Sequence, residues 1–251
     1  MAHFTTEALV LRSYKLGETS KVVVLLTRER GKLRAVARGA RGARPRYRSA
    51  LEPLSEVRVS LYGRQGAELL RLGDAELLHS AFRAGERGLD VALYLSYWAE
   101  LLDAFSPEGE AEEKVYRLAL AAVRAAEAGT PPDPLARYLE AWLLRLHGLY
   151  PPLGDCAACG AALRPGPLRY DRSARGFVCE DCGSPSGPVL SEIAAALLAR
   201  IFARPPGELA AADGPAAREI EPFHRELVSA HLERNLRSHR VIRDVVGGRA
   251  Q

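Results

Sequence analysis

The sequence predicts an α+β protein of several domains, in which a small β-barrel is followed by an all-α domain that carries a cysteine-rich insert. Three observations support this prediction. Five short apolar segments separated by glycines lie within the first 80 residues. Helical periodicity begins after Ser80. All four cysteines of the 251-residue chain fall between residues 151 and 188. We therefore expect domains at residues 1–80, 81–150, 151–188 and 189–251, the second and fourth forming one helical domain.

The N-terminal segments have the patterns of β-strands. Residues 4–12 and 69–78 are apolar, residues 22–27 are β-branched, and residues 57–62 alternate between apolar and polar. Residues 32–38 also alternate. Their apolar face is Leu33, Ala35 and Ala37, and the opposite face is Lys32, Arg34, Val36 and Arg38. Five strands in about 75 residues fit an OB-fold, with an SH3-like barrel as the alternative.

The rest of the chain has helical patterns interrupted by caps. We expect helices over residues 89–105, 107–127, 133–147, 192–203 and 216–246. Ser106 and Pro107 favour an N-cap and a first helical position, and Ser191 is a further N-cap. The last helix carries His224, His231 and His239 at spacings of seven and eight, which favours an interface or a solvated face over a metal site.

The cysteines form two C-x2-C pairs separated by 19 residues. These cysteines are Cys156, Cys159, Cys179 and Cys182. This spacing is typical of a zinc ribbon, and a glycine follows each pair where a metal-binding turn needs one. Four thiolates leave no open coordination position, so we expect one structural Zn²⁺ rather than a catalytic one. Disulfides or a redox pair are the weaker alternative.

Positive charge is concentrated near the N-terminus. Residues 1–80 contain 15 Lys or Arg against 8 Asp or Glu, whereas the remainder has 20 against 23. Residues 28–48 hold nine basic residues and one acid. Glycines and arginines alternate in the loop after residue 38, an arrangement that can follow a phosphate backbone. The predicted nucleic-acid contacts are Lys32, Arg34, Arg38, Arg41, Arg44, Arg46, Arg48 and Tyr47.

Aromatic side chains are sparse in this region, so the barrel is better suited to phosphates than to stacked bases. We expect binding with little sequence preference, to duplex as well as single strands. A second basic feature lies in the last predicted helix, where DNA contact is an open alternative to a solvated face. Its arginines are Arg234, Arg237, Arg240 and Arg243.

The sequence contains none of the motifs that would indicate a reaction. It has no G-x-x-x-x-G-K-[ST] phosphate loop, no H-E-x-x-H and no G-x-S-x-G. Its acidic residues form no cluster suited to paired magnesium ions, so we expect a protein that is not an enzyme. There is no apolar run of about 18 residues and no secretory signal, so we expect a cytoplasmic protein without a membrane partner.

Several short motifs occur in a characteristic order along the chain. They are Glu7-Ala8-Leu9-Val10-Leu11, Gly17-Glu18-Thr19-Ser20, Leu26-Thr27 with Gly31, Ala37-Arg38-Gly39-Ala40-Arg41, Leu51-Glu52-Pro53 and Asp74-Ala75-Glu76. With the layout of basic barrel, helical domain and four-cysteine insert, the sequence resembles the bacterial recombination-mediator family RecO over essentially its whole length. The cysteines resemble those of a zinc-bearing subgroup of that family.

The resemblance implies a protein without catalytic turnover that binds single- and double-stranded DNA and anneals complementary strands. It implies partners RecR and the single-stranded DNA-binding protein SSB, possible participation of RecF, and a role in loading RecA in a nucleoid-associated setting. It also maps zinc ligands onto the four cysteines and a basic surface onto residues 32–48. The alternative from another class is an RNA-binding accessory factor of the ribosome or the transcription machinery.

Overall fold

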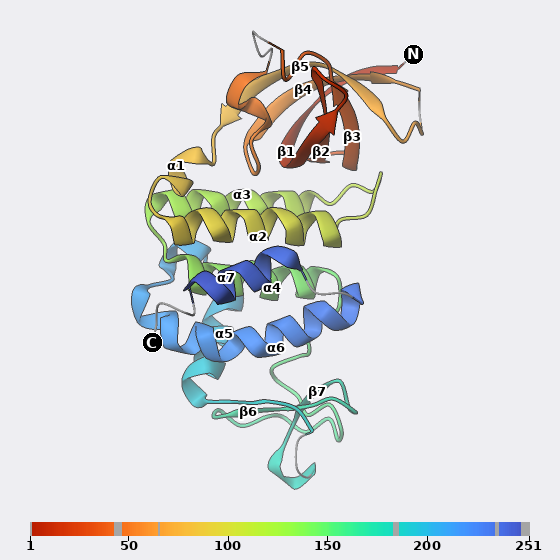
Figure 1. Cartoon of the computed structure of the whole chain (residues 1–251). Helices are drawn as coiled ribbons and strands as arrows, with labels where there is room; N and C mark the ends of the chain where they lie inside the picture. Colours follow the sequence, from red (N-terminus) through yellow and green to blue (C-terminus); the bar gives the residue numbers. More distant parts are fainter. Residues whose placement is uncertain (1, 43–46, 65, 183–185, 234–235, 247–251) are drawn as a thin grey trace. The chain divides into compact units, whose positions relative to one another are not determined.

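The computed structural model describes residues 2–42, 47–64, 66–182, 186–233 and 236–246 (Figure 1). The chain forms two compact units. The first comprises Met1–Gly129 and Asn235–Gln251, and the second comprises Thr130–Arg234. The C-terminal helix α7 (Arg237–Val246) therefore belongs to the same unit as the N-terminal strands.

The first unit contains a closed barrel with the strand order β1-β2-β3-β5-β4. Its strands are β1 (Ala2–Leu16), β2 (Ser20–Thr27), β3 (Gly31–Ala37), β4 (Glu56–Gly63) and β5 (Leu70–His79). Neighbouring strands are antiparallel except β3 and β5, which pair in parallel where Ala35 faces Leu70 and so close the barrel. The predicted OB-like barrel of five strands is confirmed.

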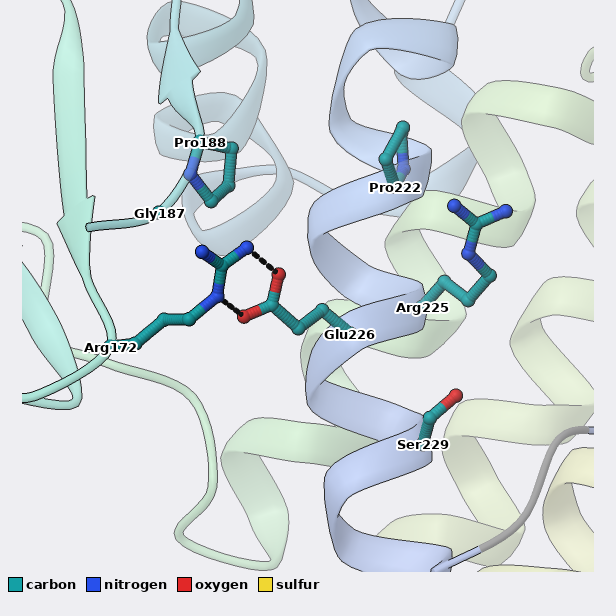
Figure 2. Close-up of a pocket in the computed structure, with 7 residues that line it drawn as sticks. All are labelled: Arg172, Gly187, Pro188, Pro222, Arg225, Glu226 and Ser229. Carbon is teal, nitrogen blue, oxygen red and sulfur yellow. Dashed lines mark hydrogen bonds and ion pairs between the residues drawn. The ribbon is translucent and has the colours of Figure 1, made fainter. Parts of the chain in front are cut away.

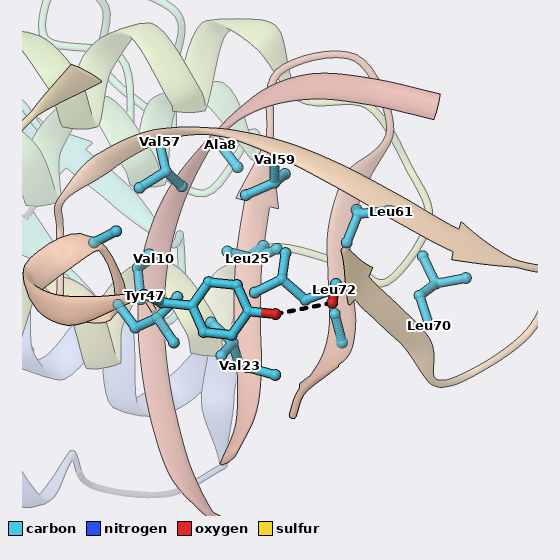
Figure 3. Packing of buried hydrophobic residues seen from close by; sticks show 14 residues of the cluster. Ala8, Val10, Val23, Leu25, Tyr47, Val57, Val59, Leu61, Leu70 and Leu72 are labelled. Carbon is cyan, nitrogen blue, oxygen red and sulfur yellow. Dashed lines mark hydrogen bonds between the residues drawn. The ribbon is translucent and has the colours of Figure 1, made fainter. Parts of the chain in front are cut away.

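The barrel encloses a core of alternate strand residues. Ala35 and Ala37 of β3 are buried in it and Leu33 packs against it, as the alternation predicts. Tyr47 joins this core from the start of the short 3-10 helix η1 (Arg48–Leu51). Its ring lies among the core side chains, and its hydroxyl donates to the carbonyl of Leu72 at 3.1 Å (Figure 3).

Three further helices follow the barrel in this unit. They are α1 (Phe82–Gly85), α2 (Leu89–Phe105) and α3 (Glu113–Ala128). Helix α2 has the predicted bounds. The prediction that the next helix starts at Pro107 is wrong, because α3 begins at Glu113. Residues 107–113, which contain four glutamates and are called the acidic segment below, lead into it.

Backbone bonds to β3 explain why the acidic segment does not begin the helix. The N–H of Gly109 donates to the carbonyl of Lys32 at 3.0 Å, and the N–H of Lys32 approaches the carbonyl of Pro107 at 3.4 Å. Gly31 allows this close approach, since a Cβ at that position would overlap the backbone of Glu110. Gly31 also has a φ of +66°, which other residues rarely adopt.

The prediction of one long helix over residues 216–246 is also wrong. The structure has α6 (Gly214–Leu232) and α7, and Glu233 between them has a φ of +53°. The carboxylate of Glu100 on α2 accepts the N–H groups of the first residues of α7 at 3.1 and 2.8 Å. This cap satisfies free N–H groups at the start of a separate helix. His224 and His239 consequently lie on different helices in different units.

The second unit combines helices with a cysteine-rich hairpin. Its helices are α4 (Pro132–Leu146), α5 (Glu192–Ala203) and α6, with 3-10 turns η2 (Glu180–Cys182), η3 (Pro206–Glu208) and η4 (Ala211–Asp213). Its sheet has the order β7-β6-β8, with β6 (Leu168–Asp171), β7 (Gly176–Val178) and β8 (Val189–Leu190). Ser191 caps α5 as predicted, since its side chain accepts the N–H of Ala194. Helix α4 begins at Pro132, slightly before the predicted start.

A buried polar chain links α4 to α6. Nη2 of Arg137 donates to Glu140 at 2.7 Å, and the other carboxylate oxygen of Glu140 lies 2.9 Å from Nδ1 of His224. The hydroxyl of Tyr150 lies 3.0 Å from Nε2 of the same ring. Burial lowers the pKa of His224 despite the nearby carboxylate. A neutral His224 therefore donates from Nδ1 and accepts the Tyr150 proton at Nε2.

Candidate nucleic-acid interface and metal centre

The four predicted cysteine ligands converge at one point. Their sulfur atoms all lie within 4.8 Å of one another. Cys156 and Cys159 lie on a turn closed by the N–H of Gly160, which donates to the carbonyl of Cys156 at 2.8 Å. Cys179 and Cys182 follow β7 in a similar turn. Gly160 has the expected positive φ of +74°, whereas Gly183 lies outside the described residues.

The chemistry of this sulfur cluster fits a metal ion. Backbone hydrogen bonds, first of all from the N–H of Cys179, lower the pKa of Cys156 to about 6. The neighbouring sulfurs, that of Cys159 first, raise the pKa of Cys182. Four adjacent thiolates repel one another unless a cation neutralises them. The cluster can therefore hold a metal ion, and four sulfur ligands would close its coordination.

The cysteine-rich insert at residues 151–188, called the cysteine ribbon below, is attached to α6 within the second unit. The hairpin of β6 and β7 pairs Tyr170 with Phe177. Arg172, just beyond β6, donates from Nε and Nη2 to the two carboxylate oxygens of Glu226 at 2.5 and 2.7 Å (Figure 2). A pocket of about 520 Å³ lies beside this pair. Arg225, which also lines it, pairs with Glu221, so neither of the described arginines offers the pocket an unpaired charge.

The turn after β6 is held by a carboxylate. Asp171 accepts hydrogen bonds from the hydroxyl of Ser173 and from the N–H groups of Ala174 and Ser186, the latter two at 2.8 and 3.1 Å. These bonds, that of Ser173 first, hold the pKa of Asp171 well below its usual range. The fixed turn positions the strand that leads to the second cysteine pair.

On the barrel, some of the predicted nucleic-acid contacts form ion pairs within the protein, and others are exposed. Lys32 has a side chain that is only 11% exposed, and its ammonium group lies 3.3 Å from the carboxylate of Asp103. Arg34 forms an ion pair with Glu108 of the acidic segment. Both residues thus lie on the predicted face of β3, but that face is partly covered by residues that follow the barrel.

Arg38 and Arg41 are predicted contacts that the structure describes as exposed. Both are exposed, and Arg38 forms no ion pair within the described ranges. The backbone N–H of Arg41 donates to the carbonyl of Thr19 at 2.9 Å, and its side chain donates to the carbonyl of Gly17 at 3.2 Å. These bonds tie the loop after β3 to the β1–β2 turn and hold the guanidinium of Arg41 beside that turn.

Tyr47 is not available to nucleic acid. It is 4% exposed, and the prediction of Tyr47 as a nucleic-acid contact is wrong because the ring fills the barrel core. Arg44 and Arg46 lie outside the described residues, as does the side chain of Arg48.

Of the four predicted C-terminal arginines, the structure describes the side chains of two. Arg237 and Arg240 are exposed on α7. Arg234 and the side chain of Arg243 lie outside the described part of the chain. Whether this helix contacts DNA stays an open prediction.

Sequence reasoning missed the ion pairs between the barrel and the residues that follow α2. Arg28 contacts Glu113 at 3.0 Å, in addition to the pair of Arg34 with Glu108. Its contact with Glu7 of β1 at 3.3 Å lies within the barrel. The sequence feature that could have predicted these pairs is the acidic segment, which has four glutamates and lies after the basic region in the chain. The two runs have opposite charge, which favours their contact.

Comparison with known proteins agrees with this architecture. Residues 1–81 match the family described as Recombination protein O N terminal, and residues 87–240 match Recombination protein O C terminal. The chain is 35% identical over 242 residues to a DNA repair protein RecO of Anaeromyxobacter sp. (strain K), covering 94% of each chain. It is 37% identical over 256 residues to DNA repair protein RecO of Streptomyces griseus, covering 96% of this chain and 99% of the relative.

An OB-like barrel followed by helices and a four-cysteine cluster, with these relatives, defines a DNA repair and recombination protein. The chain belongs to the RecO family. No helix in the described ranges is long and apolar enough to cross a membrane.

Proposed function

We propose that this protein is a recombination mediator that binds single- and double-stranded DNA and anneals complementary strands without catalysing a covalent reaction. The observation that carries the proposal is the exposed pair Arg38 and Arg41 on the edge of an OB-like barrel in a RecO-family chain. Guanidinium groups bind phosphate oxygens in a planar, bidentate manner and carry no base preference.

The aromatic side chains of the barrel support annealing over tight single-strand binding. Tyr47 is buried, Tyr62 is stacked on His3 with ring centroids 4.4 Å apart, and Phe4 is covered by the guanidinium of Arg30 at 4.2 Å. Bases on a bound strand therefore find few free rings on which to stack. Neutralising phosphates while leaving the pairing edges free lets two strands approach and pair.

We propose that the sulfur cluster binds one Zn²⁺ with a structural role. All four ligands are sulfur, which Zn²⁺ accepts in a closed tetrahedral site. The ion would fix the cysteine ribbon at its tip, while Arg172 and Glu226 hold it at α6. It would supply no catalytic chemistry, since no coordination position would stay open.

The partners follow from family membership as proposals. We propose that the protein acts with RecR and SSB, with RecF as a further partner, to load RecA onto SSB-coated DNA in the cytoplasm, next to the nucleoid. The names of the relatives state DNA repair only. They favour DNA over the alternative of an RNA-binding accessory factor.

Strand annealing on SSB-coated DNA tests the proposal, because it examines activity and partner together. We expect the purified protein to accelerate annealing of complementary SSB-coated strands without any nucleoside triphosphate. An absolute requirement for ATP, or higher affinity for an RNA oligomer than for DNA of the same length, would contradict it.

A further inference from the structure

A groove of about 710 Å³ lies on the barrel beside β3. It is bounded by the β2–β3 turn, the β4–β5 connection and the acidic segment. The cations that line it are Arg30, Lys32, Arg34 and Arg64. Glu108 of the acidic segment also lines the groove and pairs with Arg34. Glu29 and Glu68 also line the groove, so its lining holds four cations and three carboxylates. This excess of cations suits phosphates, yet two of the cations already hold a carboxylate, Lys32 that of Asp103 and Arg34 that of Glu108.

We propose that the acidic segment occupies the place of nucleic-acid phosphates in this groove, and that a DNA strand must displace Glu108 from Arg34 in order to bind there. The inference rests on the proposed DNA binding by the barrel. It adds an internal competitor for the phosphate backbone of a single strand at this groove.

The pairs on this face of the barrel differ in burial, and the difference separates structural contacts from exchangeable ones. The side chains of Lys32 and Asp103 are 11% and 15% exposed, so water and ions rarely reach that pair. The side chains of Arg34 and Glu108 are 42% and 48% exposed. An ion pair so open to solvent is weakly held, and a phosphate can replace its carboxylate.

The hydrogen bonding of Arg34 also leaves one of its donors unused. Its Nε is buried and has no hydrogen-bond partner among the described residues, while Nη2 contacts Glu108. A phosphate has oxygens for both positions of the guanidinium fork, which a single carboxylate contact does not use. Arg34 would therefore bind a phosphate through more donors than it now uses.

The backbone of the acidic segment brings Glu108 to the groove. The N–H of Gly109 is bonded to the carbonyl of Lys32, so the segment meets β3 in an isolated parallel bridge between Lys32 and Glu108. Glu110 is exposed and forms no ion pair within the described residues. Its charge would repel an approaching strand. The segment thus pairs with Arg34 through Glu108 and also lowers the local positive potential.

Displacement of Glu108 has a consequence for salt dependence. A phosphate that reaches a free arginine releases a counterion from DNA, which steepens the fall of affinity with salt. A carboxylate freed in the same step attracts a cation and offsets part of that release. Glu108→Gln should therefore raise affinity about two- to fivefold at low salt, the range expected for breaking an exposed pair, and should steepen the salt dependence.

The test is a double-mutant cycle on the full chain. Affinity for fluorescein-labelled oligothymidylate is measured by anisotropy between about 50 and 200 mM salt. The variants are Glu108→Gln, Arg34→Gln and the two together. Glu86→Gln, an exposed acid before α2, is the control with the same change of charge. Thermal unfolding of each variant shows whether the fold is retained.

The proposal expects tighter binding by Glu108→Gln, little change in the Glu86→Gln control, and loss of the gain when Arg34 is also replaced. If the wild type binds DNA and Glu108→Gln binds equally well, the competition is refuted while DNA binding stands. A gain that persists without Arg34 reflects general charge and also refutes it. If the wild type binds no DNA at any salt, the proposed function and this inference fall together.

Discussion

The ammonium group of Lys32 on β3 is held by one residue of α2, Asp103. Nζ lies 3.3 Å from the Asp103 carboxylate and donates to the backbone carbonyl of the same residue at 2.6 Å. Arg12 of β1 contacts the carboxylate from the other side at 3.0 Å. Lys32, which the sequence pattern predicts to contact nucleic acid, thus joins the barrel to α2.

Lys32→Ala should therefore lower stability more than DNA affinity. Removing the ammonium leaves Asp103 with Arg12 as its remaining cation among the described residues, and we expect a loss of about 1–3 kcal/mol in the free energy of unfolding, measured by urea denaturation. Lys15→Ala, which removes an exposed lysine of β1, is the control and should cost about 0.5 kcal/mol or less. If Lys32→Ala keeps its stability but loses DNA binding, the original assignment of Lys32 to the interface is restored.

Gly31→Ala should disturb the contact between β3 and the acidic segment. Gly31 and Gly39 both have positive φ, at +66° and +74°, so alanine strains the backbone at either position. Only at Gly31 would the added Cβ overlap another backbone, that of Glu110. Gly31→Ala should therefore lower the free energy of unfolding by about 1–3 kcal/mol more than Gly39→Ala. Equal losses in chemical denaturation would show that the close approach costs nothing.

Much of this fold follows from local pattern. The alternation of residues 32–38 predicts the buried face of β3, and the spacing of the cysteines predicts the cluster around Cys156. Such features depend on strand geometry and metal-ligand spacing, which neighbouring residues set. The start of α3 could not be predicted in this way, since the residues after Ser106 bond to Lys32, which is distant in sequence.

The candidate site likewise combines features that local pattern predicts with features that distant contacts determine. The basic character of the region around Arg38 is a property of composition, so it can be predicted from sequence. The burial of Tyr47 depends on the packing of the start of η1 against strands distant in sequence, and the break after α6 depends on Glu100 capping α7. Both are tertiary effects that override local propensity.

Cys179→Ser should remove the metal from the cysteine ribbon. We expect one Zn²⁺ per wild-type chain by elemental analysis, and less than stoichiometric Zn²⁺ with faster proteolysis of residues 151–188 in the variant. Ala158→Ser changes an exposed residue between two ligands and should keep the metal. A chelator should reproduce the effect in the wild type. Purified wild type without zinc, and with unchanged proteolysis after chelation, would exclude the site.

Acidification should destabilise the second unit through His224. Burial lowers its pKa in the folded state below the ordinary 6.5, so the unfolded chain takes up the proton first as pH falls. The stabilising contribution is present above pH 6.5 and is lost as pH falls through the folded pKa. The loss rises by at most about 1.4 kcal/mol per pH unit for one proton. Thermal unfolding at pH 7.5 and 5.5, compared with His224→Gln, measures it. An identical pH dependence in the variant would contradict the assignment.

The central claim is that the exposed arginines at the edge of the barrel bind DNA phosphates. The most direct measurement is the slope of log affinity against log salt for Arg38→Glu/Arg41→Glu, with Arg237→Glu/Arg240→Glu on α7 as the matched control. We predict weaker binding of any sequence by the barrel variant, a slope flatter by roughly 0.7 per lost contact on single strands and 0.9 on duplex, and a smaller effect of the control. Normal binding with an unchanged slope in the barrel variant, together with loss of binding in the α7 variant, would contradict the claim and move the DNA site to the C-terminal helix.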